Sequence, residues 1–437
     1  MTRASDVLLD AAASIGQTLC NTAYWHDGRC NWVGRSSREA GGTAAQLQIT
    51  PTVAALGPEF YGGSAGVGLF LAQLHQLRPH RFVVDTARGA ARHALRKSAD
   101  LPTQVARSFH SGPIGIAFAA ATIAQLTGDT QLVDEALELA RRAAASLEGE
   151  GLLDVIGGSA GVIAPLLALS RLHGIDSLRQ PALALADELR GAATQNDGAW
   201  CWDNDRACGK GVGPTPLCGF AHGASGMGLS LIEAGSVCGR SDWIDGGLAA
   251  FAYEDRLYDT AHRNWPDLRD LSNGASTTAA SDSATPLRPQ SRAPSFMVAW
   301  CHGAAGIGLA RLRALQLLPA RASEVVGGVD RAVACARTQL DALPAGSDAT
   351  LCHGRGGLAE TLLLESTIRG DARQRRATVR MWTRLLKARG DDPEWPSGVP
   401  SGGSNPSLML GLAGVGYSLL RAAAPERVPS VLMIGAS

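Results

Sequence analysis

The sequence has no excess of charge of either sign and no long hydrophobic run. Its 437 residues contain 40 Lys and Arg against 40 Asp and Glu, without a basic stripe. This balance argues against nucleic acid or an anionic membrane as the main partner. No stretch approaches the roughly 18 uninterrupted apolar residues of a membrane span, and the opening residues lack a secretory apolar run. We therefore expect a cytoplasmic protein without a membrane span.

Two further absences concern phosphoryl transfer and disulfide bonds. No phosphate-binding loop of the form Gly-x-x-x-x-Gly-Lys-Ser/Thr and no kinase signature occurs, so the chain is not expected to drive phosphoryl transfer. The nine cysteines form an odd set without the dense pairing of a small secreted scaffold. In a reducing compartment they would be free thiols or metal ligands.

Glycine is abundant, with 52 residues, and many of the glycines are ordered along the chain. A Gly-x-x-Gly motif followed by an apolar run occurs seven times. The runs carry few charges, which is typical of a helix buried on most sides, and glycines in the first turn would permit close backbone packing. The pairs are Gly63/Gly66, Gly112/Gly115, Gly158/Gly161, Gly223/Gly226, Gly303/Gly306, Gly354/Gly357 and Gly411/Gly414.

Seven helical stretches with polar faces alternate with the apolar ones, and their apolar positions recur at three and four residues. An amphipathic outer layer around an apolar inner layer predicts an all-α fold, namely an α/α toroid or double seven-helix barrel. An open solenoid is the alternative, but seven unequal repeats without obvious polar caps favour a closed ring. Outer helices are expected at about 4–20, 130–148, 176–193, 323–341 and 371–389.

We expect residues 1–437 to form a single domain, in which two insertions interrupt the regular spacing of the repeats. The insertion around 196–220 is rich in Gly, Asp, Cys and Trp and leads directly to His222. The insertion around 264–295 contains several prolines and is expected to be a mobile surface loop. Neither is long enough to be a domain, although short strands are conceivable in the longer loops.

Two cysteines stand at the same point of neighbouring repeats. Cys301 and Cys352 are each followed by His-Gly, and a third copy of the motif keeps His222 but has Ala221 in place of the cysteine. Soft thiolate and imidazole ligands that recur in register predict a zinc site assembled across the repeats.

These groups should converge on one mouth of the barrel, because the residues before each motif enter the inner helix at the same end. Cys301, Cys352 and His353 would supply three ligands for one zinc ion per chain and leave the fourth position to water or substrate, as in catalytic sites. A structural site would need a fourth protein ligand. His302 is the candidate, although its neighbour Cys301 makes simultaneous coordination awkward.

Asp154 is a carboxylate at the same rim, four residues before Gly158 in an otherwise apolar stretch. One interpretation is a helix N-cap. The other is a partner that orients His222 or stabilises its charge during acid–base catalysis.

These motifs resemble the lanthionine synthetase C-like (LanC) family, and more closely the cyclase domain of class II (LanM-type) lanthipeptide synthetases. The similarity runs from the first helix to about Leu432. In that family the two cysteines and the following histidine bind zinc, which implies these roles for Cys301, Cys352 and His353. The active-site histidine and aspartate of the family correspond to His222 and Asp154. The matching motifs are Gly219-Phe220-Ala221-His222-Gly223, Asn264-Trp265-Pro266-Asp267-Leu268-Arg269, Trp300-Cys301-His302-Gly303, Leu351-Cys352-His353-Gly354 and Pro406-Ser407-Leu408-Met409-Leu410-Gly411-Leu412-Ala413-Gly414.

Two departures qualify the resemblance. Stand-alone class I cyclases carry Tyr after the first zinc cysteine and Arg four residues before it, where this chain has His302 and Met297. His302 is common in the LanM branch and is therefore kept as a third candidate catalytic residue, whereas Met297 leaves open which cation stabilises the enolate. A LanM protein also has a dehydratase domain ahead of its cyclase, and this chain begins at the cyclase, so we expect a separate dehydratase or kinase–lyase partner.

The resemblance implies an enzyme: a zinc-dependent cyclase that forms (methyl)lanthionine thioether rings on a dehydrated precursor peptide. Cysteine thiolates of the peptide would add to dehydroalanine or dehydrobutyrine. One alternative is a non-catalytic scaffold that binds the peptide for a dehydratase, and another is intermolecular addition of a thiol such as glutathione. A toroid prenyltransferase fits poorly, since its lipid cavity is lined by aromatics and these make up only 5% of the chain. For Cys201, Cys208 and Cys218, a second metal site is conceivable, but we expect three free thiols.

Overall fold

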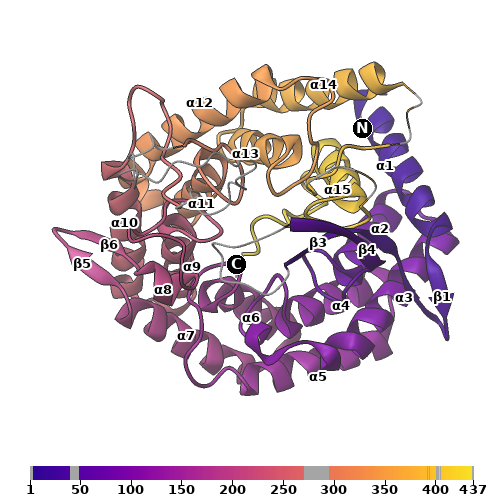
Figure 1. Cartoon of the computed structure of the whole chain (residues 1–437), viewed down its shortest axis with the longest axis horizontal. Coiled ribbons are helices and arrows are strands. Elements are labelled where there is room, and N and C mark those ends of the chain that lie inside the picture. The colour runs from indigo at the N-terminus through magenta and orange to yellow at the C-terminus, as the bar shows by residue number, and fades with distance from the viewer. Residues whose placement is uncertain are drawn as a thin grey trace, which may run out of the picture.

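Seven pairs of helices follow one another around a ring in the computed structural model of the protein (Figure 1). The structure describes residues 3–39, 49–269, 295–390, 392, 394–399, 403 and 405–435. The outer helices are α1 (Arg3–Asn21), α3 (Arg81–Lys97), α5 (Thr130–Ala145), α7 (Arg179–Gly191), α10 (Ser241–Arg256), α12 (Val326–Ala342) and α14 (Ala372–Arg389). The inner helices are α2 (Ser64–Leu77), α4 (Pro113–Thr127), α6 (Ser159–His173), α9 (Ala224–Cys238), α11 (Ala304–Leu317), α13 (Arg355–Ile368) and α15 (Leu412–Ala423).

The two layers differ in the way they bury their side chains. In α2 every residue from Ser64 to Leu74 is buried, whereas α5 buries one face, at positions such as Leu132, Ala136 and Ala140. The α/α toroid predicted from the alternation is therefore confirmed. The stretch expected at 176–193 begins with a 3-10 turn, η3 (Asp176–Leu178), before α7. No helix in the described part of the chain is long and apolar enough to cross a membrane.

The Gly-x-x-Gly motifs build the entry to each inner helix. The first glycine of every pair is the N-cap residue of its helix. At the second glycine, an added β-carbon would lie 1.8–2.4 Å from the carbonyl oxygen of the residue six positions earlier, in all seven repeats. Each entry loop thus folds back onto the first turn of its own helix, and only glycine leaves room for that approach.

Hydrogen bonds join successive entry loops into a closed circle, and all but one of the junctions are made by backbone groups alone. In most repeats the N–H two residues before the motif donates to the carbonyl of the equivalent residue in the next repeat. The last of these bonds returns from the seventh repeat to the first, which excludes an open solenoid. The bonds, of 2.9–3.2 Å, run from Tyr61 to His110, Ile156 to Ala221, Ala221 to Cys301, Trp300 to Cys352, Cys352 to Met409 and Met409 to Tyr61.

Side chains make the junction between the second and third repeats. Nδ1 of His110 lies 3.3 Å from the carbonyl oxygen of Val155, and the hydroxyl of Ser108 donates to the carbonyl of Ile156 at 2.5 Å. His110 is buried, and burial lowers the pKa of its imidazole to about 4. A neutral imidazole therefore donates its Nδ1 proton to Val155 at this seam.

In the part of the chain that the structure describes, three two-stranded antiparallel sheets interrupt the helical pattern: β1 (Tyr24–His26) with β2 (Arg29–Asn31), β3 (Val33–Glu39) with β4 (Ile49–Ala55), and β5 (Thr194–Asn196) with β6 (Ala199–Cys201). β6 and the short helix α8 (Asn204–Ala207) lie in the first expected insertion. Of the second insertion, residues 270–294 lie outside the described residues.

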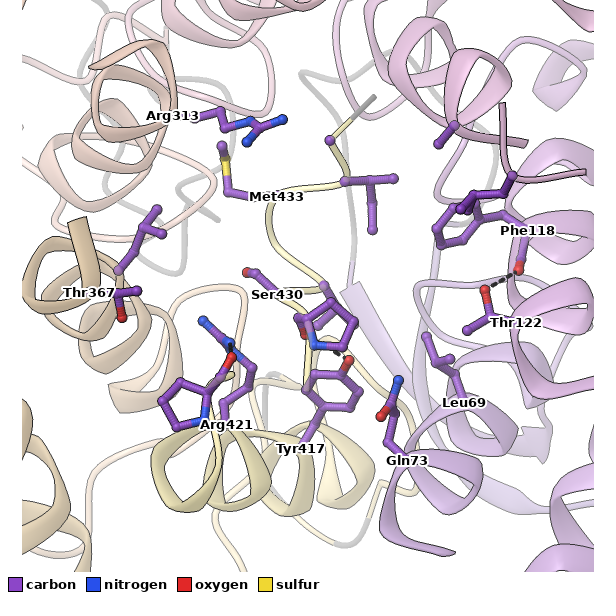
Figure 2. A pocket seen from close by; sticks show the side chains of 18 of the residues that line it. Leu69, Gln73, Phe118, Thr122, Arg313, Thr367, Tyr417, Arg421, Ser430 and Met433 are labelled. Atoms are coloured by element: carbon purple, nitrogen blue, oxygen red, sulfur yellow. Dashed lines mark hydrogen bonds between the residues drawn. The ribbon is translucent and has the colours of Figure 1, made fainter. Parts of the chain in front are cut away.

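The segment after α15 runs into the middle of the ring (Figure 1). The hydroxyl of Tyr417 donates to the carbonyl of Pro429 at 2.8 Å, and Nε1 of Trp300 donates to the carbonyl of Leu432 at 3.2 Å. Beside this segment lies a cavity of about 420 Å³, lined by the C-terminal parts of inner helices and by Met433 (Figure 2). The cavity therefore lies at the end of the barrel opposite the Gly-x-x-Gly entries.

Candidate functional site

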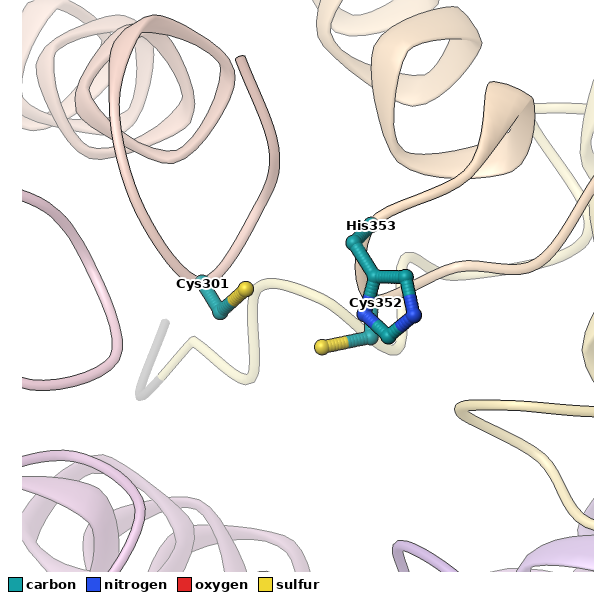
Figure 3. Close-up of side chains that lie close together, drawn as sticks. All are labelled: Cys301, Cys352 and His353. Atoms are coloured by element: carbon teal, nitrogen blue, oxygen red, sulfur yellow. The ribbon is translucent and has the colours of Figure 1, made fainter. Parts of the chain in front are cut away.

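The two repeated cysteines come together because their entry loops are neighbours in the circle. Cys301 precedes α11 and Cys352 precedes α13, and the N–H of Trp300 donates to the carbonyl of Cys352. The sulfur atoms of the two cysteines and a ring nitrogen of His353 all lie within 4.8 Å of one another. Figure 3 shows the two sulfurs and the imidazole facing a common point. The structure thus brings together the three residues predicted as zinc ligands.

A backbone carbonyl fixes the orientation of His353. Its Nε2 lies 2.9 Å from the carbonyl oxygen of Gly398 and 3.6 Å from a carboxylate oxygen of Asp348. A carbonyl can only accept, so Nε2 donates to it and Nδ1 is the ring nitrogen left for a ligand. Figure 3 shows a ring nitrogen on the side of the sulfurs. This is the arrangement that protein metal sites use to orient a ligating imidazole.

The pKa values of the two cysteine thiols are shifted in opposite directions. The thiol of Cys352 hydrogen-bonds the sulfur of Cys301, and this bond lowers the pKa of Cys301 and raises that of Cys352. The hydroxyl of Tyr61 forms a further hydrogen bond with the sulfur of Cys352. Two thiols and an oriented imidazole form a soft donor set that fits zinc, whose binding would displace the remaining thiol proton.

His302 lies outside this cluster, which among the described residues contains only Cys301, Cys352 and His353. Its ring instead stacks on that of His222, with centroids 5.4 Å apart and planes inclined by 26°. Its side chain is buried, and burial lowers the pKa of His302 to about 4. The structure thus places this imidazole beside the predicted acid–base residues.

Asp154 and His222 form a direct pair. Oδ2 of Asp154 lies 2.5 Å from Nδ1 of His222, while Oδ1 accepts a hydrogen bond from the N–H of Gly157 at 2.7 Å. The carboxylate side chain is 2% exposed and the imidazole 31%. The N-cap of α6 is Gly158, without a side-chain cap, so Asp154 is not the helix cap. It holds Nδ1 of His222 and leaves Nε2 for chemistry.

Sequence reasoning missed the contribution of the first insertion to this pair. The sulfur of Cys208 lies within 4.8 Å of the ligand atoms of Asp154 and His222. The carbonyl of the preceding Ala207 accepts hydrogen bonds from the N–H groups of Leu153 and Asp154 at 3.0 and 3.1 Å. Burial raises the pKa of Cys208 to about 12, so it remains a thiol. The insertion therefore packs directly against Asp154.

The other two cysteines of the insertion lie apart from this pair. Cys218 is buried, and its burial together with the negative charge of Glu254 raises its pKa. All three are free thiols, and within the described ranges they form no metal cluster with one another.

Comparisons with known proteins assign the family. A family model described as "Lanthionine synthetase C-like protein" matches residues 54–433. Among solved structures, nisin cyclase is similar in fold, with a TM-score of 0.56 and 19% identity over 84% of this chain and 88% of that chain. No curated protein sequence matches. Because the family match covers most of its length, the chain belongs to the lanthionine synthetase C-like family.

Proposed function

We propose that the protein is a zinc-dependent lanthipeptide cyclase, which joins a cysteine thiol of a dehydrated peptide to a dehydroalanine or dehydrobutyrine of the same peptide. The observation that carries the proposal is that the Cys301–Cys352–His353 cluster and the Asp154–His222 pair lie on adjoining entry loops at one end of the ring. The N–H of Ala221, next to His222, donates to the carbonyl of Cys301, and the ring of His302 stacks on that of His222.

Cys301, Cys352 and His353 would hold the metal ion, and a bound zinc ion lowers the pKa of a thiol and fixes its sulfur. Ionisation is only part of the acceleration. A thiol with a pKa of about 8.5 is roughly 3% ionised at pH 7, so complete ionisation gains at most ~30-fold. Positioning of the reacting groups and delivery of a proton must supply the rest.

His222 is placed to deliver that proton. Its Nδ1 is held by the buried carboxylate of Asp154, which orients the ring and leaves Nε2 available for proton transfer. When the thiolate adds to the β-carbon, the double-bond electrons move to the carbonyl oxygen. Nε2 of His222 then gives its proton to the α-carbon. His302 is the second imidazole available for this step.

The substrate would be a precursor peptide whose Ser or Thr residues have already lost water. A separate dehydratase or kinase–lyase must therefore act first. The same mouth would also suit addition of a free thiol such as glutathione, or peptide binding without turnover.

The test is incubation of the zinc-loaded protein with a dehydrated precursor peptide. We expect free thiols of the peptide to disappear towards an alkylating reagent while its mass stays constant, because thiol addition joins two parts of one molecule. A mass gain of one glutathione per dehydro residue, in the presence of glutathione, would favour the intermolecular alternative. If the thiols of the peptide stay free, the result would favour the alternative in which the protein binds the peptide without turnover. Loss of water from an undehydrated precursor would contradict the need for a partner.

A further inference from the structure

Addition of a thiolate to a dehydro residue places negative charge on the carbonyl oxygen of that residue. Such a charge is stabilised best by a fixed donor or cation that is already in place. Arg269, from the segment that begins the second insertion, brings a permanent positive charge to the same mouth.

The guanidinium of Arg269 is held in a fixed orientation. Its Nε and Nη2 donate to the two carboxylate oxygens of Asp267 at 2.9 and 2.6 Å. Asp267 is itself anchored, since its N–H donates to the carbonyl of Ser295 at 2.8 Å and its side chain is 4% exposed. A bidentate pair of this kind fixes the plane of the guanidinium as well as its position.

The guanidinium also reaches the loop that carries the first metal ligand. Nη2 of Arg269 lies 3.8 Å from the sulfur of Met297, four residues before Cys301. Burial opposes the charge of Arg269, but the hydrogen bond to Asp267 and its negative charge favour it, and the pKa of the guanidinium is raised. The cation therefore lies beside the loop that carries Cys301.

Nη1 of the guanidinium, with its two N–H groups, has no protein acceptor among the described residues. Asp267 takes Nε and Nη2. The side chain is 30% exposed, so it is open to a ligand at the mouth.

We propose that Arg269 binds the carbonyl oxygen of the dehydro residue and stabilises the enolate that forms when the thiolate adds. This inference rests on the proposed function. The thiolate sulfur bonds to the β-carbon, the electron pair of the double bond moves to the carbonyl oxygen beside Arg269, and a proton then adds to the α-carbon. The proton lost by the thiol balances the one gained by carbon, so nothing is oxidised or reduced. Asp267 is a positioning residue that holds the guanidinium.

A charge that develops only during the reaction should affect turnover more than binding. For Arg269→Met we expect kcat to fall about 100-fold or more, as when a donor to an oxyanion is removed. KM, and the affinity of the zinc-free protein for a fluorescently labelled dehydrated peptide, should change less than about 3-fold. Zinc content should stay at one equivalent. Arg269→Lys keeps the charge opposite Asp267 and should lose less activity.

Arg331→Met is the matched control. Arg331 is 35% exposed and also pairs with a carboxylate, Asp255 at 2.8 Å, but it stacks on Tyr258 at the outer layer. Its removal should leave kcat unchanged. Thermal unfolding of each variant separates loss of catalysis from loss of folding.

The contact with Met297 permits a rescue experiment. In the double variant Arg269→Met with Met297→Arg, the two side chains that touch are exchanged, and the guanidinium returns to the mouth from the other loop. We expect kcat to recover at least about 10-fold relative to Arg269→Met, because the stabilising charge is restored near the same place.

The outcomes distinguish the two proposals. If the wild-type protein forms no rings from a dehydrated peptide, the proposed function is wrong and this inference is wrong with it. If the wild type forms rings and folded, zinc-loaded Arg269→Met forms them within about 3-fold of the same rate, only the role of Arg269 is wrong. A loss of peptide affinity as large as the loss of kcat would likewise overturn the enolate role, since it would show that Arg269 only binds substrate.

Discussion

Two imidazoles at the mouth each have one ring nitrogen committed to a fixed acceptor. Nε2 of His353 faces the carbonyl of Gly398, and Nδ1 of His222 faces the carboxylate of Asp154. In both residues the second ring nitrogen is therefore left available, for a metal ion in His353 and for proton transfer in His222. The sequence predicted the two histidines because they stand in repeated motifs, and Asp154 because it is a carboxylate at the same rim in an otherwise apolar stretch. It did not predict Gly398, which lies 45 residues from His353 in no recognisable motif.

Substitution of Gly398 should weaken metal binding without touching a ligand. A β-carbon at this position would lie 2.7 Å from Nε2 of His353 and 3.0 Å from Oγ1 of Thr350. In Gly398→Ala we therefore expect the imidazole to shift and zinc affinity to fall about 10- to 100-fold, as when an outer-shell partner is lost. Competition with a chromophoric chelator measures the affinity. Gly191→Ala is the control, since a β-carbon there meets nothing within 4 Å. Equal affinities in both variants would contradict the assigned orientation.

Removal of the imidazole of His222 should abolish turnover while leaving the metal in place. Asn cannot transfer a proton at neutral pH, so His222→Asn should reduce the single-turnover rate of ring formation by about 10²- to 10⁴-fold. Asp154→Asn should cost less if the carboxylate mainly orients the ring.

Metal analysis and peptide binding provide the internal controls, and His26→Asn, a histidine with an 84% exposed side chain, is the matched variant. Unchanged rates in both His222→Asn and Asp154→Asn would transfer the proton role to His302.

At the scale of elements, the inner helices were predictable because their constraint is local. In each motif the second glycine faces the carbonyl oxygen of the residue six positions earlier, so the same signal recurs in each repeat. The hairpin β1–β2 was not predicted, although its turn contains Asp27 and Gly28 with positive φ angles of 47° and 71°. That Asp-Gly pair was the available signal. The packing of Cys208 beside Asp154 and the position of Arg269 depend on tertiary contacts of the two insertions. These segments do not recur along the chain, so no sequence pattern indicates where they pack.

The seam between the second and third repeats should make stability depend on pH. The pKa of His110 is lowered from 6.5 to about 4, chiefly by burial and also by the nearby His222. Above pH 6.5 the imidazole is neutral in both states and the seam is intact. As pH falls from about 6.5 towards 4, the unfolded chain binds a proton that the folded protein excludes, so the free energy of unfolding decreases, by up to about 3 kcal/mol for this residue.

In His110→Gln the amide can still donate to Val155 but does not titrate. The free energy of unfolding of this variant, measured by urea denaturation between pH 4 and 7, should therefore fall less steeply with acidification than that of the wild type. His26→Gln is the exposed control and should follow the wild-type curve. Parallel curves for wild type and His110→Gln would contradict a buried, neutral His110.

At the scale of the whole molecule, the ring is held together independently of the metal cluster. Hydrogen bonds between entry loops, with the side chains of Ser108 and His110 at one junction, close the circle, and the C-terminal segment runs into its middle. Trp300, next to Cys301, is fully buried, and its Nε1 donates to the carbonyl of Leu432. The loop that carries Cys301 is therefore anchored to the core through Trp300. The two thiols and His353 lie at the rim, where a metal ion adds ligand bonds without filling the interior.

Removal of zinc should therefore leave the fold intact. After treatment with a chelator, we expect an unchanged far-ultraviolet circular dichroism spectrum and a cooperative thermal transition at a lower temperature. The loss of stability should follow ligand linkage, about 2.7 kcal/mol when free zinc had been 100 times its dissociation constant. Cys301→Ala and Cys352→Ala should behave like the chelated protein and retain no stoichiometric zinc, because two protein ligands hold the ion far less tightly than three. A full equivalent of zinc retained in both variants would contradict the assigned ligands. Collapse of the helical spectrum on chelation would instead show that the cluster is a structural site on which the ring depends.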